Sequence, residues 1–375
     1  MTLSTGVHLR MAPTETAAQA ERFFDFSADM LCVAGTDGYF KRLNRNWHRT
    51  LGYTDRELLG RPYLDFVHPD DRDITIAEAT KVGLGYESVH FRNRYRCKNG
   101  SYRWLAWSAR PVLETGLIYA GARDITDEAM AEEEELVITR QRLERIQELL
   151  ASRSCKMVFQ PIVDFRTGEV IGAESLARFK APPRQPPDHW FAEADDVGLR
   201  PELELHAVEL AVPFAARLPE GTFLSVNVSP ETLLTKDFSA IADQIDGSRL
   251  VVEVTEHMAV NDYEQLNKAV SRLRKHGIRL AIDDAGAGFS SLKHIIRLVP
   301  EFIKLDMFLT RDIHTDPVKR ALASAMVAFA AEIGSTLIAE GVENKHELGV
   351  LGDLGVEDAQ GYYLGRPSLS LIQPN

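Results

Sequence analysis

From residue 151 onward, short apolar segments alternate with helix-like stretches, and this alternation constrains the fold more than any other feature of the sequence. The apolar segments read KMVFQPIVDF, VIGAESLARF, TFLSVNV, LVVEVTE, IRLAIDD, EFIKLD and TLIAEGVE. Repeated alternation of strand and helix predicts a mainly parallel sheet. The 225 residues from 151 to 375 suit a TIM-like (β/α)8 barrel, for which about 250 residues are typical, and an open doubly wound sheet is the alternative.

Polar residues stand at or near the C-terminal ends of five of these segments. They are Glu174, Asn227, Glu253, the adjacent pair Asp283 and Asp284, and Glu340. In a (β/α)8 barrel the C-terminal ends of the strands form the rim where active sites are built, so we expect these side chains to converge. Several carboxylates in one pocket repel each other unless a cation neutralises them. The sequence therefore predicts a metal site at this rim.

The donor atoms indicate which metal such a site would hold. All are oxygens, which favours hard ions such as Mg2+ or Mn2+ over Zn2+. Asp283 and Asp284 are adjacent and cannot both point inward from a regular strand, so we expect the strand to end there and the glycines of segment 285–288 to allow a sharp turn. Both carboxylates would then be free to approach two ions, which together clamp the attacking and leaving oxygens of a phosphoryl displacement.

Each of these polar residues also has an ordinary structural interpretation. A single acid at a strand end is more often a helix cap or a surface charge than a ligand, and only the joint placement favours ligation. Lys304 is either a snorkelling edge residue or a group that orients the attacking water. Arg178 either pairs with an acid or binds phosphate. Gln160 and Gln360 are either strand-end amides or groups that read guanine edges.

Residues 21–127 carry a different pattern, with short β-rich runs near positions 30, 90, 105 and 120. The pair Asn99-Gly100 separates two alternating runs, which is a strong hairpin signal. Thr54 and Glu57 have capping-box spacing at the start of a short helix. Strands, then small helices, then more strands predict an α+β domain with an antiparallel sheet and flanking helices. Residues 1–20 are expected to form a flexible tail before it.

A helical segment separates the two patterns. Between Ile125 and Leu150 there is neither proline nor glycine, and strong helix formers dominate, so we expect a continuous helix. We assign residues 128–150 to this connecting helix and residues 151–375 to the second domain. Apolar residues recur every seven positions, at Ala129, Leu136, Leu143 and Leu150. A coiled-coil seam and a solvated spacer helix are both compatible with so few heptads.

Composition excludes several other classes of protein. The chain has 55 acidic and 43 basic residues, a formal charge of -12, which argues against a broad grip on DNA or RNA. Its three cysteines lack disulfide-framework or zinc spacing, which is typical of a reducing compartment, so we expect a cytoplasmic protein. The most apolar run, from Ala321 to Ala331, is far shorter than the roughly 20 residues of a membrane-spanning helix. No signal peptide is indicated.

The second domain resembles an EAL domain. Its opening run, FQPIVDFRTGEVIGAESLARF, is similar to the start of that family, and the motifs NVSPETL, VVEVTEH, LAIDDAGAGFSSL, FIKLD, IAEGVEN and QGYYLGRP follow in the family's order. The resemblance covers about residues 140–372. It implies a barrel variant with one antiparallel strand. It also implies hydrolysis of cyclic di-GMP to the linear dinucleotide pGpG with two Mg2+ or Mn2+ ions.

The same resemblance assigns roles to individual residues by motif. It implies that one ion is held by Glu174, Asn227, Glu253 and Asp283. The second ion would be served or bridged by Asp284 and Glu340, which with Lys304, the lysine assigned to the catalytic water, form the catalytic set. Substrate contacts would come from Gln160, Leu176, Arg178, Asp306 and Gln360. Glu256 matches an acid that holds the loop after Asp284, and Glu343 is expected to be a supporting acid.

The chain departs from the family's pattern at two places. Ser175 stands where the EAL signature has alanine, and it should face away from the pocket. The loop reads DDAGAGFSSL where the family commonly has DDFGTGYSSL, so Ala285, Ala287 and Phe289 replace a phenylalanine and two hydroxyl-bearing residues. The altered loop keeps a second hypothesis open, a catalytically weak or inactive receptor that binds cyclic di-GMP and signals through the linker. The intact set of ligand residues favours the enzyme.

The first domain resembles a PAS domain. The run GYFKRLNRNWHRTLGYTDRELLGRPYLDFVHPDDR is similar to its helical core, and ARDITDE to the strand that leads into a signalling helix. No cysteine lies in a flavin-photosensor motif, and the helix near residues 73–81 contains no histidine, which disfavours a covalent flavin adduct and haem. The ligand of this domain therefore stays unassigned. The combination implies a sensor that controls the EAL domain in a homodimer, with contacts through the EAL domain, the PAS domain and the linker.

Overall fold

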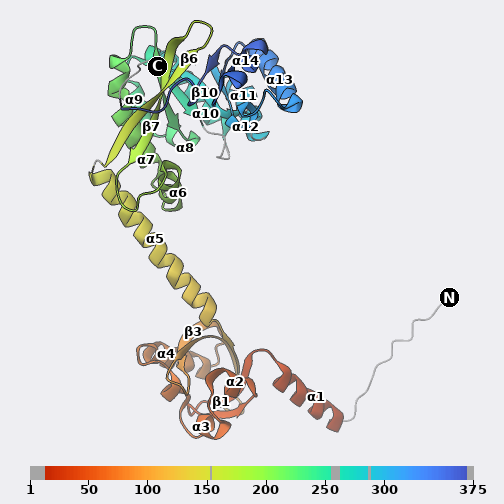
Figure 1. Ribbon diagram of the computed structural model, residues 1–375. Helices are drawn as coiled ribbons and strands as arrows, with labels where there is room; N and C mark the ends of the chain where they lie inside the picture. Colours follow the sequence, from red (N-terminus) through yellow and green to blue (C-terminus); the bar gives the residue numbers. More distant parts are fainter. Residues whose placement is uncertain (1–12, 153, 255–261, 286–288, 370–375) are drawn as a thin grey trace, which may run out of the picture. The chain divides into compact units, whose positions relative to one another are not determined.

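The computed structural model describes residues 13–152, 154–254, 262–285 and 289–369 (Figure 1). The chain divides between Val137 and Ile138 into two compact units. No helix in the described part of the chain is long and apolar enough to cross a membrane. The three cysteines, Cys32, Cys97 and Cys155, are buried and free.

The first unit is built on a five-stranded antiparallel sheet with the strand order β2-β1-β5-β4-β3. Its strands are β1 (Met30–Gly35), β2 (Phe40–Leu43), β3 (Ser88–Arg96), β4 (Tyr102–Val112) and β5 (Leu117–Asp124). Between β2 and β3 lie α2 (Asn46–Leu51), α3 (Asp55–Leu59), η1 (Tyr63–Phe66), η2 (Pro69–Asp71) and α4 (Arg72–Gly83). This arrangement confirms the predicted α+β domain.

Local signals in the sequence account for the turns and helix starts of this unit. Asn99 and Gly100 connect β3 to β4, and Gly100 has a φ of 90°, a conformation that favours glycine. Thr54 and Glu57 form the predicted capping box at the start of α3. Helix α1 (Pro13–Phe26) begins inside the segment that we expected to be a tail up to residue 20. The predicted domain boundaries themselves stay predictions.

Helix α5 (Thr126–Ser152) is the continuous connecting helix that the sequence predicted. Within the second unit, its Ile146 and Leu149 are fully buried in a cluster with Trp190. Leu136, by contrast, has 70% of its surface exposed. The end of α5 is therefore part of the second unit's core, whereas the middle of the helix carries exposed apolar side chains.

The second unit is a closed eight-stranded barrel with the order β10-β11-β12-β13-β6-β7-β8-β9, which confirms the barrel and rules out the open doubly wound sheet. Its strands are β6 (Cys155–Asp164), β7 (Glu169–Phe179), β8 (Phe223–Val228), β9 (Leu250–Val254), β10 (Arg279–Ala285), β11 (Phe302–Leu305), β12 (Thr336–Ala339) and β13 (Asp358–Ala359). Strand β6 runs antiparallel to both β7 and β13, and the other neighbouring pairs are parallel.

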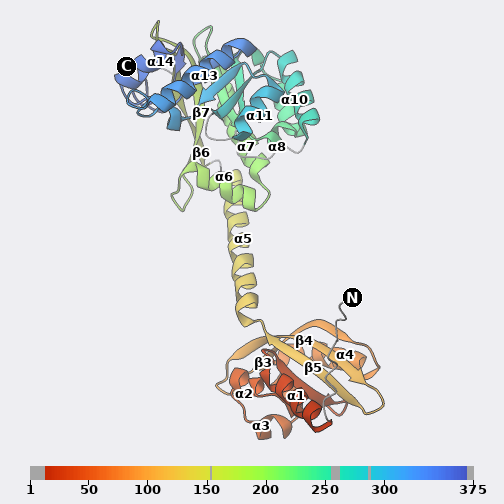
Figure 2. The same cartoon turned by 90° about the vertical axis from the view of Figure 1, so that its right-hand side faces the viewer.

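Helices lie outside the strands of this barrel (Figure 2). They are α6 (Pro187–Asp196), α7 (Arg200–Ala211), η3 (Val212–Arg217), α8 (Pro230–Leu233), α9 (Lys236–Ala242), η4 (Gly247–Arg249), α10 (Tyr263–Lys275), α11 (Phe289–Leu298), α12 (Met307–Thr310), α13 (Pro317–Ile333) and α14 (Lys345–Asp353). Short strands linked by helices are what the alternation in the sequence predicted.

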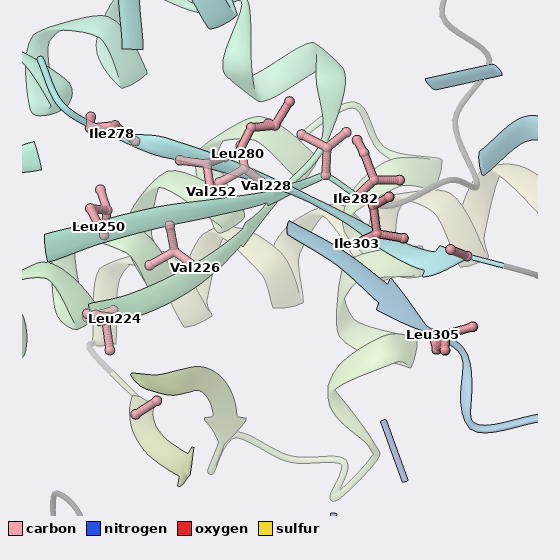
Figure 3. Packing of buried hydrophobic residues seen from close by; sticks show 14 of the residues in the cluster. Leu224, Val226, Val228, Leu250, Val252, Ile278, Leu280, Ile282, Ile303 and Leu305 are labelled. Carbon is pink, nitrogen blue, oxygen red and sulfur yellow. The ribbon is translucent and has the colours of Figure 1, made fainter. Parts of the chain in front are cut away.

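Side chains alternate across each barrel strand, and the two faces have different partners. Outward residues such as Leu224, Val226 and Val252 are buried in the main core (Figure 3). A second, smaller cluster is formed by Ile162, Phe223, Val251, Ala281, Phe302 and Ile338. These residues precede the polar ones by two positions on most parallel strands, so the chain fills one end of the barrel with apolar side chains and leaves the other end to polar groups.

Candidate active site

The predicted polar residues meet at the C-terminal ends of the parallel strands. Glu174 lies on β7, Asn227 on β8, Glu253 on β9 and Asp283 on β10. Glu340 directly follows β12. The strand register sets Asn227 opposite Glu253 and Gln160 opposite Glu174. The barrel therefore brings together side chains that are up to 166 positions apart along the sequence, counted from Glu174 to Glu340.

Lys304, on β11, lies at the centre of this group, with only 1% of its side chain exposed. Its Nζ atom is 2.6 Å from Glu340 Oε1, 2.8 Å from Glu253 Oε2, 3.2 Å from Asp283 Oδ1 and 3.7 Å from Glu174 Oε2. A buried ammonium needs such partners because its charge is costly to remove from water. We call Glu174, Glu253, Asp283, Asp284 and Glu340 the carboxylate cluster.

Strand β10 does not end at the aspartate pair as we expected, but continues to Ala285 with an irregular register between Ile282 and Ala285. Asp284 has a φ of 54°, in the left-handed region that residues other than glycine rarely adopt. This local distortion breaks the alternation of side chains. Carboxylate oxygens of Asp283, Asp284 and Glu340 consequently come within 4.8 Å of one another.

The charges of the cluster shift one another's pKa values. Burial raises the pKa of Glu253 to about 8, with Glu174 and Asp283 adding to the rise and Lys304 opposing it. Burial and the nearby Asp283 and Asp306 raise the pKa of Asp284 to about 6.

Glu340 and Lys304 also have shifted pKa values. Burial raises the pKa of Glu340 well above its usual range. For Lys304, burial alone lowers the pKa, but attraction by Asp283, Glu174 and other carboxylates outweighs it and raises the pKa. Four carboxylates thus contact one ammonium and a fifth, Asp284, lies beside two of them, which leaves the cluster short of positive charge.

The residues present fit divalent cations. Asp283 Oδ1 is buried and accepts no hydrogen bond from the described residues, although the Lys304 ammonium is near. A buried carboxylate oxygen without a donor is costly, and a cation would satisfy it. All of the candidate donors are carboxylate or amide oxygens, the set that hard ions such as Mg2+, Mn2+ and Ca2+ prefer.

Amide side chains hold Glu174 from both sides. Its Oε1 accepts a hydrogen bond from Asn227 Nδ2 at 2.8 Å, and its Oε2 accepts one from Gln360 Nε2 at 2.6 Å. Gln360 Nε2 also lies 3.1 Å from Gln160 Oε1, and Gln160 Nε2 donates to the carbonyl of Gly365. The two glutamines therefore belong to the same network as the carboxylates.

The remaining predicted substrate contacts lie around this network. Leu176 and Arg178 follow Glu174 at intervals of two on β7, so they lie on the same face of the strand. Arg178 is exposed, and its guanidinium donates to the backbone carbonyl of Ala177. Asp306 caps α12 by accepting a hydrogen bond from the backbone N–H of Phe308 at 2.8 Å.

Two predicted supporting acids are not part of the described cluster. Glu256 lies outside the described residues, as does Ala287 of the altered loop. The Glu343 side chain is 45% exposed and pairs with Arg311 at 2.6 Å. Ser175, which replaces the usual alanine, is buried and donates a hydrogen bond to the carbonyl of Ser225 at 2.7 Å, away from the cluster as expected.

Sequence reasoning missed Glu347 as a structural support of the segment that follows Glu340. Glu347 is buried and accepts hydrogen bonds from the backbone N–H groups of Asp312, Glu343 and Asn344. Asn344 and Glu347 form a capping box, and their spacing is the signal that would have revealed this role.

Comparison with protein families finds two matches. The EAL domain model matches residues 143–367, and the PAS fold model matches residues 40–119. The first match covers the barrel and the end of α5 that packs on it. The second lies within the antiparallel unit.

Two curated Escherichia coli proteins are similar to the barrel part of the chain. The probable cyclic di-GMP phosphodiesterase PdeN is 29% identical over 223 residues, which cover 56% of this chain and 43% of PdeN. The oxygen sensor protein DosP is 30% identical over 237 residues, which cover 59% of this chain and 29% of DosP. The chain thus spans less than half the length of these relatives.

Solved structures are similar over the same region. BlrP1 of Klebsiella pneumoniae, solved as a calcium and cyclic di-GMP complex, is 31% identical, with a TM-score of 0.53, over 58% of this chain and 57% of that chain. BlrP1 was also solved with manganese and cyclic di-GMP. An EAL domain protein of Listeria monocytogenes, 23% identical, has the same fold with a TM-score of 0.55 over 60% of this chain and 93% of that chain.

Proposed function

This chain belongs to the EAL domain family, and from that premise we propose that it is a cyclic di-GMP phosphodiesterase that yields pGpG. The observation that carries the proposal is the arrangement of Glu174, Glu253, Asp283 and Glu340 around the buried Lys304. Acids from four separate strands or strand ends gathered at one barrel rim are costly to fold, and a shared chemical role explains that cost.

We further propose that two divalent ions, Mg2+ or Mn2+, act in the site. One would be held by Glu174, Asn227, Glu253 and Asp283, and Asp284 and Glu340 would serve the second ion or bridge the two. When bound, the ions supply Lewis-acid activation of the phosphodiester and of the attacking water. The nearness of Asp283, Asp284 and Glu340 supports this assignment, as does the buried Oδ1 of Asp283, which accepts no hydrogen bond from the described residues.

In this proposal Lys304 orients the attacking water. Its Nζ atom lies within 3.7 Å of four of the carboxylates, and as an ammonium it would act as a hydrogen-bond donor rather than as a base. Asn227 and Gln360 fix both oxygens of Glu174 and keep that carboxylate in one orientation. The role of these amides would therefore be to position an acid before substrate arrives.

Substrate would contact residues on the rim around the cluster. We assign the guanine edges to Gln160 and Gln360, whose amides both donate and accept hydrogen bonds. Arg178 is exposed and bears a planar fork suited to phosphate. Leu176 and Asp306 complete the proposed contacts. Support comes from PdeN, which is described as a probable cyclic di-GMP phosphodiesterase, and from the BlrP1 complex with cyclic di-GMP.

We also propose that the PAS domain controls the rate of the EAL domain through α5. Support comes from the continuity of this helix over residues 126–152 and from the burial of Ile146 and Leu149 against Trp190 of the barrel unit. A change at the sensor end of the helix would then reach the barrel core. The proposed active assembly is a homodimer.

The deciding experiment is incubation of the purified full chain with cyclic di-GMP and Mg2+ or Mn2+, followed by chromatography of the nucleotides. We expect pGpG to appear, and EDTA to stop its formation. Absence of product with both metals, combined with tight cyclic di-GMP binding in calorimetry, would instead identify the receptor function. Absence of both turnover and binding would reject the family's ligand for this chain.

A further inference from the structure

Strands β6 and β7 extend a row of side chains beyond the carboxylate cluster. Their register pairs Gln160 with Glu174, Val158 with Leu176, and Lys156 with Arg178. The backbone N–H of Lys180 donates to the carbonyl of Ser154 at 3.0 Å, so the pairing continues one step further.

The two faces of this strand pair differ. The odd-numbered residues Cys155, Met157 and Ala177 are buried in the main core. The even-numbered residues Lys156, Arg178 and Lys180 are exposed, on the face that also carries Gln160 and Glu174. We call Lys156, Arg178 and Lys180 the cationic strip. It is the continuation of the site's own face along β6 and β7.

The cationic strip lacks acidic partners. No carboxylate of the described residues lies within ion-pair range of its three side chains, and Arg178 donates a hydrogen bond to the backbone carbonyl of Ala177. Like charges directly opposite each other across two strands are unfavourable, and Lys156 stands opposite Arg178. The Lys156 side chain, in hydrogen-bonding range of Lys180, also lowers the pKa of Lys180. The chain has a formal charge of -12, so three neighbouring cations without acidic partners stand out. Such a group is suited to binding an anionic ligand.

Isolated exposed lysines are common and need no explanation. The three side chains of the cationic strip differ from isolated lysines because they lie next to one another and share one face with the carboxylate cluster. Arg178 is four residues from Glu174, about 13 Å along an extended strand, and long lysine and arginine side chains can reach back over part of that distance. A cyclic dinucleotide has two phosphodiesters on one ring, so one can lie at the cluster while the other lies nearer the strip.

We propose that the cationic strip binds the phosphodiester of the cyclic dinucleotide that is not cut, and that Lys156 and Lys180 thereby select for substrates with two phosphodiesters. This inference rests on the proposed function and deepens it. Because the contact exists both before and during the reaction, its loss should weaken binding and raise KM while kcat stays close to wild type.

The first test compares two double variants that each remove two positive charges. Lys156→Gln/Lys180→Gln alters the strip and leaves Arg178 in place, whereas Lys268→Gln/Lys275→Gln alters α10 on the outside of the barrel. Calorimetry with cyclic di-GMP and Ca2+ should show about tenfold weaker binding for the strip variant than for wild type. The control variant should bind with the affinity of wild type. The affinity of the strip variant should also depend less on salt. Equal affinity of the strip variant and wild type would overturn the proposal.

The second test asks whether the strip recognises a second phosphodiester or merely attracts anions. The probe is bis(p-nitrophenyl) phosphate, which has a single phosphodiester, and its hydrolysis with Mn2+ is followed by absorbance. We expect kcat/KM for this compound to be the same in wild type and strip variant, and kcat/KM for cyclic di-GMP to fall about tenfold. An equal fall for both compounds would overturn the proposal, because it would indicate a general electrostatic effect.

These outcomes separate the two proposals. If wild type binds cyclic di-GMP but forms no pGpG, the phosphodiesterase proposal fails, and calorimetry still decides the role of the strip. If wild type forms pGpG and the strip variant has the same affinity and KM, the strip proposal alone fails. If wild type binds no cyclic di-GMP, both fail. Unchanged thermal unfolding of the two double variants would exclude misfolding as the cause of any loss.

Discussion

At the scale of single residues, the site depends on one ammonium held among carboxylates. Lys304 is 1% exposed and contacts acids from β7, β9, β10 and the end of β12. Attraction to this one cation partly offsets the repulsion among the acids. Burial first, and the neighbouring carboxylates second, raise the pKa values of Glu253 and Glu340, and a further cation would oppose both effects. The protonation of these acids should therefore depend both on pH and on whether a metal ion is bound.

Glu174 offers the most direct test at this scale. We expect Glu174→Ala to lower the rate of pGpG formation more than about a hundredfold. Substitution of a residue that only supports a metal ligand usually lowers activity by about 10- to 100-fold, and loss of a ligand itself should cost more. The matched control is Glu343→Gln, which removes an acid of the same chain that is 45% exposed and paired with Arg311. The control should keep turnover close to wild type. Similar rates for Glu174→Ala and wild type would show that the cluster is not the reaction site.

Stability of the metal-free protein should depend on pH in a defined direction. The pKa of Glu253 is about 8 in the folded chain against an ordinary value of 4.5, so between these values the folded state binds more protons than the unfolded state. The contribution of this carboxyl to the free energy of unfolding is then fully present below about pH 4.5 and is lost as pH rises through about 8. In EDTA, the unfolding temperature followed by fluorimetry should fall by several degrees between pH 5.5 and 8, and Mn2+ should reduce this fall because the ligands bind it deprotonated.

The control for this pH dependence is Glu253→Gln, which cannot titrate at that position and should show a shallower fall in EDTA. An unfolding temperature that rises with pH in EDTA for the wild type would contradict the assigned shift.

At the scale of elements, two features set the site apart from a regular barrel. The distortion of β10 at Asp284 places two adjacent carboxylates on one side of the strand, which an undistorted strand would not allow. The end of α5 packs on the barrel beside α6, where Trp190 contacts Phe179 of β7 at a ring separation of 5.8 Å. Phe179 lies between Arg178 and Lys180 in the sequence, so α5 and α6 pack against the opposite face of the strand segment that carries these two residues.

This packing predicts a measurable dependence of barrel stability on α5. Leu149 is fully buried, and Leu149→Ala should lower the free energy of unfolding of the barrel unit by about 2–5 kcal/mol, the usual cost of such a cavity. Leu136→Ala, in the exposed part of the same helix, should change it by less than about 0.5 kcal/mol. Urea unfolding followed by circular dichroism measures both. Equal effects of the two variants would mean that the end of α5 does not pack on the barrel.

At the scale of the whole molecule, the chain combines a PAS fold and an EAL barrel through one helix. That helix exposes the large apolar side chains of Met130, Leu136, Val137 and Ile138. Side chains of this kind on a solvated helix suit contact with a second helix. The proposed homodimer would bury them.

The dimer proposal has its own test. We expect sedimentation of the full chain to show a dimer at micromolar concentration, and Leu136→Glu to shift it toward the monomer because a charge cannot be buried at a helical seam without a partner. Glu133→Gln, an exposed change in the same stretch, serves as the control and should leave the dimer unchanged. A dimer that Leu136→Glu leaves intact would exclude this part of α5 from the interface.

The sequence by itself determined the order of strands and helices, the barrel, the linker helix and the types of residue at the strand ends, because these depend on local patterns of apolar and polar residues. Only the tertiary structure decided which side chains meet. It placed Lys304 among four acids and held Asp284 in a left-handed conformation. It also set Glu343 on the surface and made Glu347 the buried acid. Closing the barrel sets these distances between strands far apart in sequence, and no local pattern records them.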